Sequence, residues 1–177
     1  MVLFVIVTTC VEVMGQDCLG EADLRKVAVI YDSKYGNTEK IAEALSEGMK
    51  REGLDADCVR IDNVDPNKLA EYELLAIGAP THGFGISRPM KDFLKKLEGV
   101  NLKNKKAFAF DTRLKSRFAG SAAKGIEKQL KELQMTIIKP YVSAIVKGSK
   151  GPLEEGAEEK FIQIGSEIVK MLRITQK

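Results

Sequence analysis

From residue 27 onward, short apolar runs alternate with stretches whose apolar residues recur every three or four positions. The apolar runs cover residues 27–31, 56–60, 74–78, 106–110 and 135–146, and the helical stretches cover 38–51, 89–97, 120–133 and 158–173. Strands that alternate with helices over short connections form βαβ units, in which the strands are parallel and the helices cover the sheet. The pattern therefore predicts an α/β fold, a doubly wound five-stranded parallel sheet with the strand order 2-1-3-4-5.

The helical periodicity also predicts which side chains face the core. Ile41, Leu45 and Met49 lie four residues apart, and Gly53 follows as a stop signal. The last helix is expected to turn four apolar residues inward, Phe161, Ile164, Ile168 and Leu172. These spacings predict one core large enough for a single domain.

In sheets of this type, ligands bind beyond the carboxyl ends of the strands, where the strand order reverses. Here that point lies between the first and third strands. Three loops are expected to converge on it, residues 32–38, 79–88 and 111–120.

The first loop has the composition of a phosphate site. It consists of Ser33, Lys34, Tyr35, Gly36, Asn37 and Thr38, directly before a helix. Hydroxyls, backbone N–H groups and the positive end of the helix dipole all suit a phosphate monoester. The alternative is a polar turn in which Asn37 or Thr38 only caps the helix. The glycine spacing matches neither a Walker A loop nor a dinucleotide-binding loop.

The second loop includes Pro80, Thr81, His82, Gly83, Phe84 and Gly85. Because glycines flank Phe84, the backbone has the freedom to approach a flat ligand closely. The alternative is a flexible crossover loop, and His82 is either a hydrogen-bond partner or proton donor for a ligand or a solvated loop residue.

The third loop begins with Asp111, Thr112 and Arg113, and its cations Arg113, Lys115 and Arg117 lie within five residues. They suit an anionic partner or a cofactor tail, and the alternative is a solvated basic loop. Gly120 and Ser121 are expected to cap the helix that follows.

Residues 27–173 resemble the short-chain flavodoxin family. The resemblance lies in Ser33–Thr38, in Gly78-Ala79-Pro80-Thr81 with the following His82–Pro89, in Asp111-Thr112-Arg113, in Gly120–Ala123 and in Gly151-Pro152-Leu153. The segment 80–89 is similar to that of a poorly characterised prokaryotic subgroup. The resemblance implies a three-layer sandwich that holds noncovalent FMN. The phosphate is expected on residues 33–38, and the ring between the second and third loops, with Phe84 and Phe118 as stacking candidates.

The cofactor-binding residues that the resemblance implies are Ser33, Lys34, Tyr35, Gly36, Asn37, Thr38, Pro80, Thr81, His82, Gly83, Phe84, Gly85, Asp111, Thr112 and Arg113. No catalytic side chain is expected, because the flavin carries the redox chemistry. The favoured function is electron transfer by an FMN carrier. One alternative is an NAD(P)H:quinone oxidoreductase in which Arg88, Arg113 or Lys115 recruits the nicotinamide cofactor. The other is a flavin-free interaction domain.

Charge and cysteine content restrict the partners. The chain has 28 Lys and Arg, 25 Asp and Glu, a net charge of +3 and no dense basic stripe, so no nucleic-acid partner is predicted. Cys10, Cys18 and Cys58 are widely spaced and His82 is the single histidine, so neither a metal site nor a disulfide framework is expected. Typical flavodoxins are acidic and dock positive partners, so the redox partner of this net positive chain is unknown. We predict a cytoplasmic monomer or weak dimer.

Residues 1–26 are expected to be an extension to the FMN-binding domain of residues 27–177. The apolar run at 2–7 lacks a preceding basic region and is too short to cross a bilayer, so stable membrane insertion is not expected. Four alternatives remain: a targeting segment, a dispensable extension, a start at Met14, or an additional edge strand that packs on the sheet or on a partner.

Overall fold

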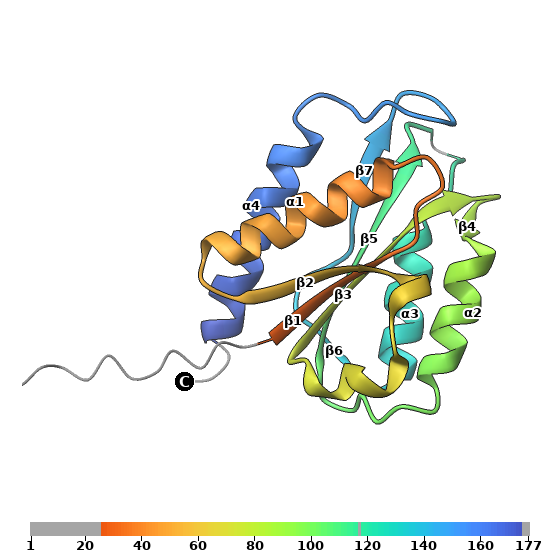
Figure 1. Ribbon diagram of the computed structural model, residues 1–177. Helices are drawn as coiled ribbons and strands as arrows, with labels where there is room; N and C mark the ends of the chain where they lie inside the picture. The colour runs from red at the N-terminus through yellow and green to blue at the C-terminus, as the bar shows by residue number, and fades with distance from the viewer. Residues whose placement is uncertain (1–25, 117, 175–177) are drawn as a thin grey trace, which may run out of the picture.

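A computed structural model describes residues 26–116 and 118–174 of the chain, with helices on both faces of one central sheet (Figure 1). The strands are β1 (Lys26–Tyr31), β2 (Asp55–Arg60), β3 (Leu74–His82), β4 (Gly85–Ile86), β5 (Lys106–Leu114), β6 (Thr136–Ile137) and β7 (Val142–Val146). The helices are α1 (Asn37–Arg51), α2 (Arg88–Leu97), α3 (Ala122–Glu132) and α4 (Ala157–Ile174), with 3₁₀ turns at Ile61–Asn63 and Pro66–Glu71. The predicted three-layer α/β sandwich is confirmed.

The sheet has the order β2-β1-β3-β5-β6, with β7 also paired to β5. Its main strands are parallel; in β1, for example, Val29 pairs with Cys58 of β2 and with Ala76 of β3. Counted along the predicted strands, this is the order 2-1-3-4-5. The strand order therefore reverses between β1 and β3, as predicted.

The strand predicted over residues 135–146 is in fact two strands. β6 pairs with the start of β5, and β7 pairs with its end, from Phe110 opposite Val142 to Leu114 opposite Val146. Pro140 lies in the break, and a proline has no N–H to donate to a central ladder. The prediction of a strand beside β5 is confirmed, and the prediction that it is continuous over residues 135–146 is wrong.

β3 and β5 each extend four residues beyond the predicted strand ends. β3 continues through His82 because β4 folds back against it, with Thr81 opposite Ile86. β5 continues through Leu114 because it is paired with β7. Residues 79–82 and 111–114, which the sequence assigned to loops, therefore belong to strand ends. Pairing with a neighbouring strand holds them more firmly than a loop would.

The two faces of the sheet bury separate apolar clusters. On one face, Val27 and Val29 of β1 pack with Ile41 and Leu45 of α1 and with the apolar side of α4. On the other, the alternate β1 residues pack with α2 and α3. The inward-facing residues predicted for α1 and α4 are all buried, in agreement with the periodicity.

Close packing of α1 against α4 depends on two glycines that the sequence analysis did not single out. A Cβ atom on Gly48 would collide with the carbonyl of Ile162, and one on Gly165 would collide with the carbonyl of Leu45. The two helices therefore approach backbone to backbone. This contact seats α1, whose first turn is at the candidate site.

Helix ends follow the predicted caps in part. Ser121 is the N-cap of α3, where its hydroxyl accepts a hydrogen bond from the Lys124 N–H at 3.2 Å, so α3 starts at Ala122 rather than at residue 120. Gly53 follows α1 with a φ of +84°. Within 26–116 and 118–174, no helix has the length and hydropathy needed to cross a bilayer. The expectations for residues 1–25 lie outside the described residues.

Candidate functional site

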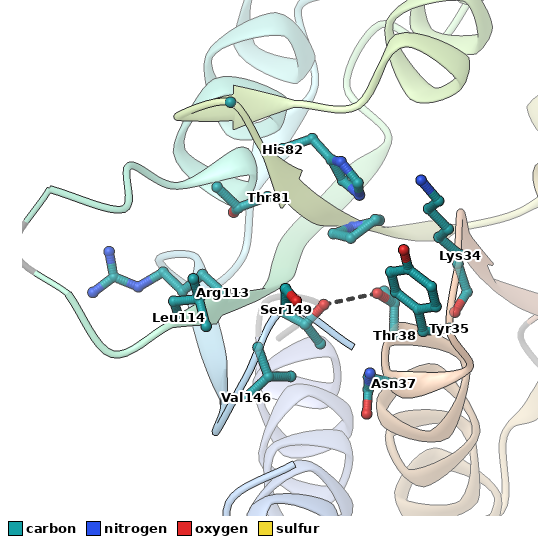
Figure 2. A pocket seen from close by; sticks show the side chains of 14 residues that line it. Lys34, Tyr35, Asn37, Thr38, Thr81, His82, Arg113, Leu114, Val146 and Ser149 are labelled. Atoms are coloured by element: carbon teal, nitrogen blue, oxygen red, sulfur yellow. Dashed lines mark hydrogen bonds between the residues drawn. The ribbon is translucent and has the colours of Figure 1, made fainter. Parts of the chain in front are cut away.

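A cleft of about 180 Å³ opens at the carboxyl ends of β1, β3 and β5, where the strand order reverses (Figure 2). All three predicted loops contribute to it. Its lining consists of Ser33, Lys34, Tyr35, Asn37, Thr38, Pro80, Thr81, His82, Gly83, Thr112, Arg113, Leu114, Val146 and Ser149. Eleven of the fifteen predicted site residues are in this set.

The loop between β1 and α1 is held in a tight turn by its own polar groups. Gly36 is the N-cap of α1 and has a φ of +81°, a conformation that glycine adopts at little cost. Its N–H donates to the Ser33 hydroxyl at 3.1 Å. Ser33 and Thr38 are buried, so this end of the cleft is preformed.

No side chain among the described residues caps α1. The Asn37 amide donates to the carbonyl of Lys150 at 3.0 Å, and the Thr38 hydroxyl is bonded to the Thr112 hydroxyl at 2.8 Å. The alternative that Asn37 or Thr38 merely caps the helix is therefore wrong. Since the first turn of a helix has no intrahelical acceptors for its N–H groups, these donors remain for an anion.

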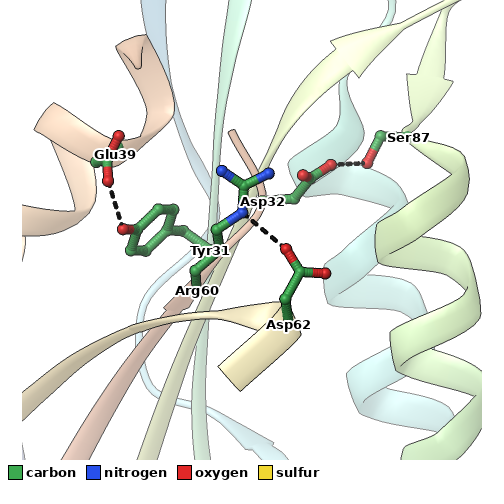
Figure 3. Close-up of polar contacts among 6 residues, drawn as sticks. All are labelled: Tyr31, Asp32, Glu39, Arg60, Asp62 and Ser87. Carbon is green, nitrogen blue, oxygen red and sulfur yellow. Dashed lines mark hydrogen bonds and ion pairs between the residues drawn. The ribbon is translucent and has the colours of Figure 1, made fainter. Parts of the chain in front are cut away.

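The charges around this turn favour an anion. Lys34 lines the cleft, with its Nζ 5.4 Å from the ring centroid of Tyr35. The carboxylate of Glu39, in the first turn of α1, accepts a hydrogen bond from the Tyr31 hydroxyl at 2.7 Å (Figure 3). Burial and the bond to Glu39 raise the pKa of Tyr31, so its hydroxyl stays a donor. The carboxylate in the first turn of α1 is thus already engaged by Tyr31.

The second loop is a β-hairpin rather than a flexible crossover. Its turn consists of Gly83 and Phe84, both with positive φ, at +50° and +73°. A hydrogen bond of 2.6 Å from the Ser87 hydroxyl to the buried Asp32 carboxylate fastens the far side of the hairpin to the end of β1 (Figure 3). Gly83 lines the cleft, whereas Phe84 does not.

The aromatic residue that lines the cleft is not one of the two predicted stacking candidates. Phe84 is 74% exposed and Phe118 is 82% exposed, and neither lines the cleft. Tyr35 is 46% exposed and is part of the lining. The ring nearest to a bound ligand is therefore that of Tyr35, which comes from the phosphate loop.

The third loop is anchored by a carboxylate beneath the cleft. Asp111 is fully buried, and its Oδ2 accepts hydrogen bonds from the Thr81 hydroxyl, the Ser121 hydroxyl and the Ala123 N–H at 2.7–3.0 Å. Asp111 does not line the cleft. Its Oδ2 therefore joins β3, β5 and α3, while its Oδ1 is buried without a hydrogen-bond partner in the structure.

Two of the cations predicted to receive an anion are already engaged. Arg113 donates through Nη1 to the carbonyl of Gly120 at 2.8 Å, and Lys115 is paired with Glu154 at 3.1 Å. Figure 2 shows the guanidinium of Arg113 directed away from Thr38. Nevertheless Arg113 lines the cleft, and its buried Nε has no hydrogen-bond partner in the structure. The Nε is thus a buried donor without an acceptor.

Sequence reasoning missed three lining residues, Leu114, Val146 and Ser149. Leu114 and Val146 end the paired strands β5 and β7, and Ser149 follows β7. The family resemblance includes Gly151-Pro152-Leu153, and this is the one sequence signal that the loop after β7 lies near the site. A Cβ on Gly151 would crowd the Asn37 amide, so the loop is seated against the start of α1.

The arrangement suits a phosphate ester joined to a flat, partly apolar group. The lining combines the hydroxyls of Ser33 and Thr38 and the ammonium of Lys34 with the apolar side chains of Pro80, Leu114 and Val146. In the part of the chain that the structure describes, no cluster of His, Cys, Asp or Glu has the makings of a metal site.

Comparison with known proteins gives a consistent result. A family profile described as flavodoxin matches residues 29–163. A flavodoxin of Clostridium saccharobutylicum is 36% identical over 88 residues, which are 49% of this chain and 55% of that protein. An NAD(P)H dehydrogenase (quinone) of Cupriavidus metallidurans is 30% identical over 97 residues, 44% of this chain and 49% of that protein. The chain thus spans about half the length of the curated relatives it matches.

Solved structures extend the likeness over most of the described chain. A flavodoxin from the domain Archaea superposes with a TM-score of 0.74 and 26% identity, covering 84% of this chain and 99% of its own. Flavodoxin 1 of Bacillus cereus superposes with a TM-score of 0.71 at 24% identity, covering 82% of this chain and 97% of its own, which is a likeness of fold.

Proposed function

The chain belongs to the flavodoxin family, and from this premise we propose that it binds FMN in the cleft and serves as an electron carrier. The observation that supports this most directly is the uncapped start of α1 beside the buried hydroxyls of Ser33 and Thr38. These groups fit a phosphate monoester. When bound, the flavin ring accepts and releases the electrons.

The donor set of the cleft also fits the rest of the cofactor. The buried Arg113 Nε lacks an acceptor, and a ligand with carbonyl or ring nitrogen atoms supplies one. Tyr35 and Pro80 offer a ring face and an apolar face at the opening. The residues proposed to hold FMN are therefore the lining residues rather than all of the predicted set, and Gly36, Phe84, Gly85 and Asp111 are left out of it.

The size of the cleft favours a carrier with an accessible flavin. Its volume of about 180 Å³ is below the roughly 300 Å³ at which pockets that enclose a drug-sized ligand begin. The phosphate end is enclosed, while a flavin ring has to lie across the opening. An exposed ring edge suits electron transfer to another protein.

The reductase alternative receives less support from the geometry. Of the three cations expected to recruit a nicotinamide cofactor, Arg113 and Lys115 are held by Gly120 and Glu154. Arg88 begins α2 and does not line the cleft. Consumption of NAD(P)H in the presence of a quinone by the FMN-loaded protein would establish the reductase instead. A cytoplasmic location and a monomeric or weakly dimeric state stay predictions.

Flavin titration tests the proposal. We expect the purified full chain to bind FMN with a change in the visible absorbance spectrum. The Ser33→Ala and Thr38→Ala variants should weaken FMN by about tenfold each, the equivalent of about 1.4 kcal/mol, and riboflavin by much less. No binding of FMN would overturn the proposal, and equal loss for FMN and riboflavin would remove the phosphate assignment.

A further inference from the structure

A second hollow lies beside the cleft, between the β3–β4 hairpin and α3. It is an open groove of about 620 Å³, here named the α3 groove, and its lining includes Phe84, Ile86, Gly120, Lys124, Lys128 and Tyr141. Gly83 lines the cleft and the next residue, Phe84, lines the groove. The hairpin turn is therefore the wall between the two hollows.

Glycines bring α3 close under the hairpin and leave Phe84 standing above the groove. A Cβ atom on Gly125 would lie 2.9 Å from Cδ1 of Ile86, and one on Gly120 would collide with the carbonyl of Phe84. Gly120 itself has a φ of +66°. The floor is consequently backbone and Ile86, which is apolar, and the hairpin tip is fixed in place.

Phe84 carries two unfavourable features at once. Its φ of +73° is uncommon for a residue with a bulky side chain, and the ring is mostly exposed to solvent. Neither feature contributes to the fold, because Phe84 is not part of either core cluster. A ring held outward in a strained turn is typical of a contact surface rather than of a packed loop.

The rim of the α3 groove is positively charged. Lys124, Lys128 and Lys131 lie on one face of α3, at spacings of four and three residues. The acidic residue among them, Glu127, is largely buried and accepts from both Lys131 Nζ at 2.6 Å and the Tyr141 N–H at 2.9 Å. Glu127 is thereby neutralised, and it holds Tyr141 at the groove wall.

The other two lysines keep their charge available. Within the described residues Lys124 has no ion-pair partner, and Lys128 Nζ is 3.7 Å from Glu132 with both side chains mostly in water. An exposed pair of this kind contributes little and is screened by salt. The α3 groove therefore combines an apolar floor, two aromatic rings and an excess of positive charge.

We propose that the α3 groove docks an acidic protein that exchanges electrons with this chain. Carboxylates of the partner would face Lys124 and Lys128, and an apolar side chain would sit between Phe84 and Tyr141. Charge complementarity selects the acidic partner, and the hairpin wall places it next to the flavin end of the cleft. The role of the groove in electron exchange rests on the proposed function.

The test uses the full chain loaded with FMN, reduced and mixed in a stopped-flow instrument with a probe protein. The probes are a rubredoxin, a small acidic iron–sulfur protein, and a cytochrome c of basic charge. We expect the rate with rubredoxin to fall about tenfold as ionic strength rises from about 20 to about 200 mM. The rate with cytochrome c should not fall.

Three variants separate the groove from the net charge. Lys124→Glu with Lys128→Glu should lower the low-salt rate with rubredoxin about tenfold. Phe84→Ala should lower it about fivefold without changing the salt dependence. The matched control, Lys160→Glu with Lys170→Glu, makes the same charge change on exposed positions of α4 and should alter the rate less than twofold. Equal losses in the groove variant and the control would overturn the proposal.

Binding of rubredoxin to the flavin-free protein, followed by NMR, tests the surface independently of FMN. Shift changes centred on Phe84, Gly120 and Lys124 support docking, and changes elsewhere, or none, overturn it. If the full chain takes up no FMN, the proposed function fails while this measurement still decides whether an acidic protein docks here. Self-association in sedimentation velocity that Phe84→Ala abolishes would assign the α3 groove to a second copy instead.

Discussion

The two ends of the cleft differ in how far their side chains are buried. We call the end formed by residues 33–38 the phosphate end, and the end formed by the β3–β4 hairpin and the third loop the ring end, after the proposed position of FMN. At the phosphate end, Ser33 and Thr38 are buried and hydrogen-bonded, and the Gly36 N–H closes the turn by donating to the Ser33 hydroxyl. At the ring end, the hairpin tip and the third loop present Phe84 and Phe118 to solvent. One end is preformed, and the other is an exposed surface.

The difference indicates what each end contributes. A preformed turn binds an anion without paying for reorganisation, so the phosphate end is suited to supply affinity. The exposed ring end encloses little, so it is suited to supply contact with another molecule. The two ends are nevertheless joined, because the Thr38 hydroxyl of the first loop is bonded to the Thr112 hydroxyl of the third.

Removal of the Asp111 carboxylate should have the largest effect, because it is the common acceptor that joins β3 and β5 to α3. Asp111→Ala leaves three donors without an acceptor in a buried place. We expect the free energy of unfolding to fall by about 3 kcal/mol in chemical denaturation. The control Asp62→Ala removes an exposed ion pair with Arg60 and should cost less than about 0.5 kcal/mol. Similar losses for the two variants would contradict the assigned role of Asp111.

A matched pair of glycine substitutions compares the two ends directly. Gly120→Ala adds a Cβ that collides with the Phe84 carbonyl at a positive φ, so the free energy of unfolding should fall by about 2–3 kcal/mol. Gly36→Ala has a positive φ but open space around its Cβ, so it should cost only about 1 kcal/mol. If Gly36→Ala proved the more damaging, the close contact between Gly120 and the Phe84 carbonyl would not be the stronger of the two constraints.

Aromatic substitutions test which ring accompanies the flavin. Because Tyr35 lines the cleft, Tyr35→Ala should raise the dissociation constant of FMN about fivefold. Phe84→Ala and Phe118→Ala should leave it within about twofold, since both rings lie outside the lining. Fluorescence titration measures all three constants. A large loss of affinity in Phe84→Ala alone would restore Phe84 as the stacking residue.

The Tyr31–Glu39 hydrogen bond should give the smallest effect. Tyr31→Phe releases a carboxylate near the phosphate end, so we expect FMN to bind about twofold more weakly.

The same bond makes stability depend on pH. The pKa of Tyr31 is raised in the folded protein above the 10.0 of a free tyrosine, so above pH 10 the unfolded chain loses this proton first. The free energy of unfolding should therefore begin to fall near pH 10 and continue to fall as the pH rises toward the raised pKa of Tyr31, and it should fall less in Tyr31→Phe. Identical slopes in the two proteins would contradict the pKa shift.

Most of the fold was accessible from local patterns. The periodicities of α1 and α4 identified the buried residues, and the alternation of strands and helices predicted the sheet order. The break near Pro140 and the extra length of β3 and β5 were missed, because they depend on which distant strand lies alongside. Polar residues such as Thr112 belong to a strand because they pair with β3 and β7, although their composition is typical of a loop.

The sequence by itself determined the α/β architecture and the sheet edge where the strand order reverses, because both follow from short-range periodicity. It also determined that residues 33–38 have a composition that suits a phosphate, because this follows from turn chemistry. Only the tertiary structure decided that Phe84 faces the α3 groove and that Asp111 serves as a buried anchor. It also decided that Val146 and Ser149 complete the cleft. These placements depend on contacts between segments far apart in the chain, which no local pattern encodes.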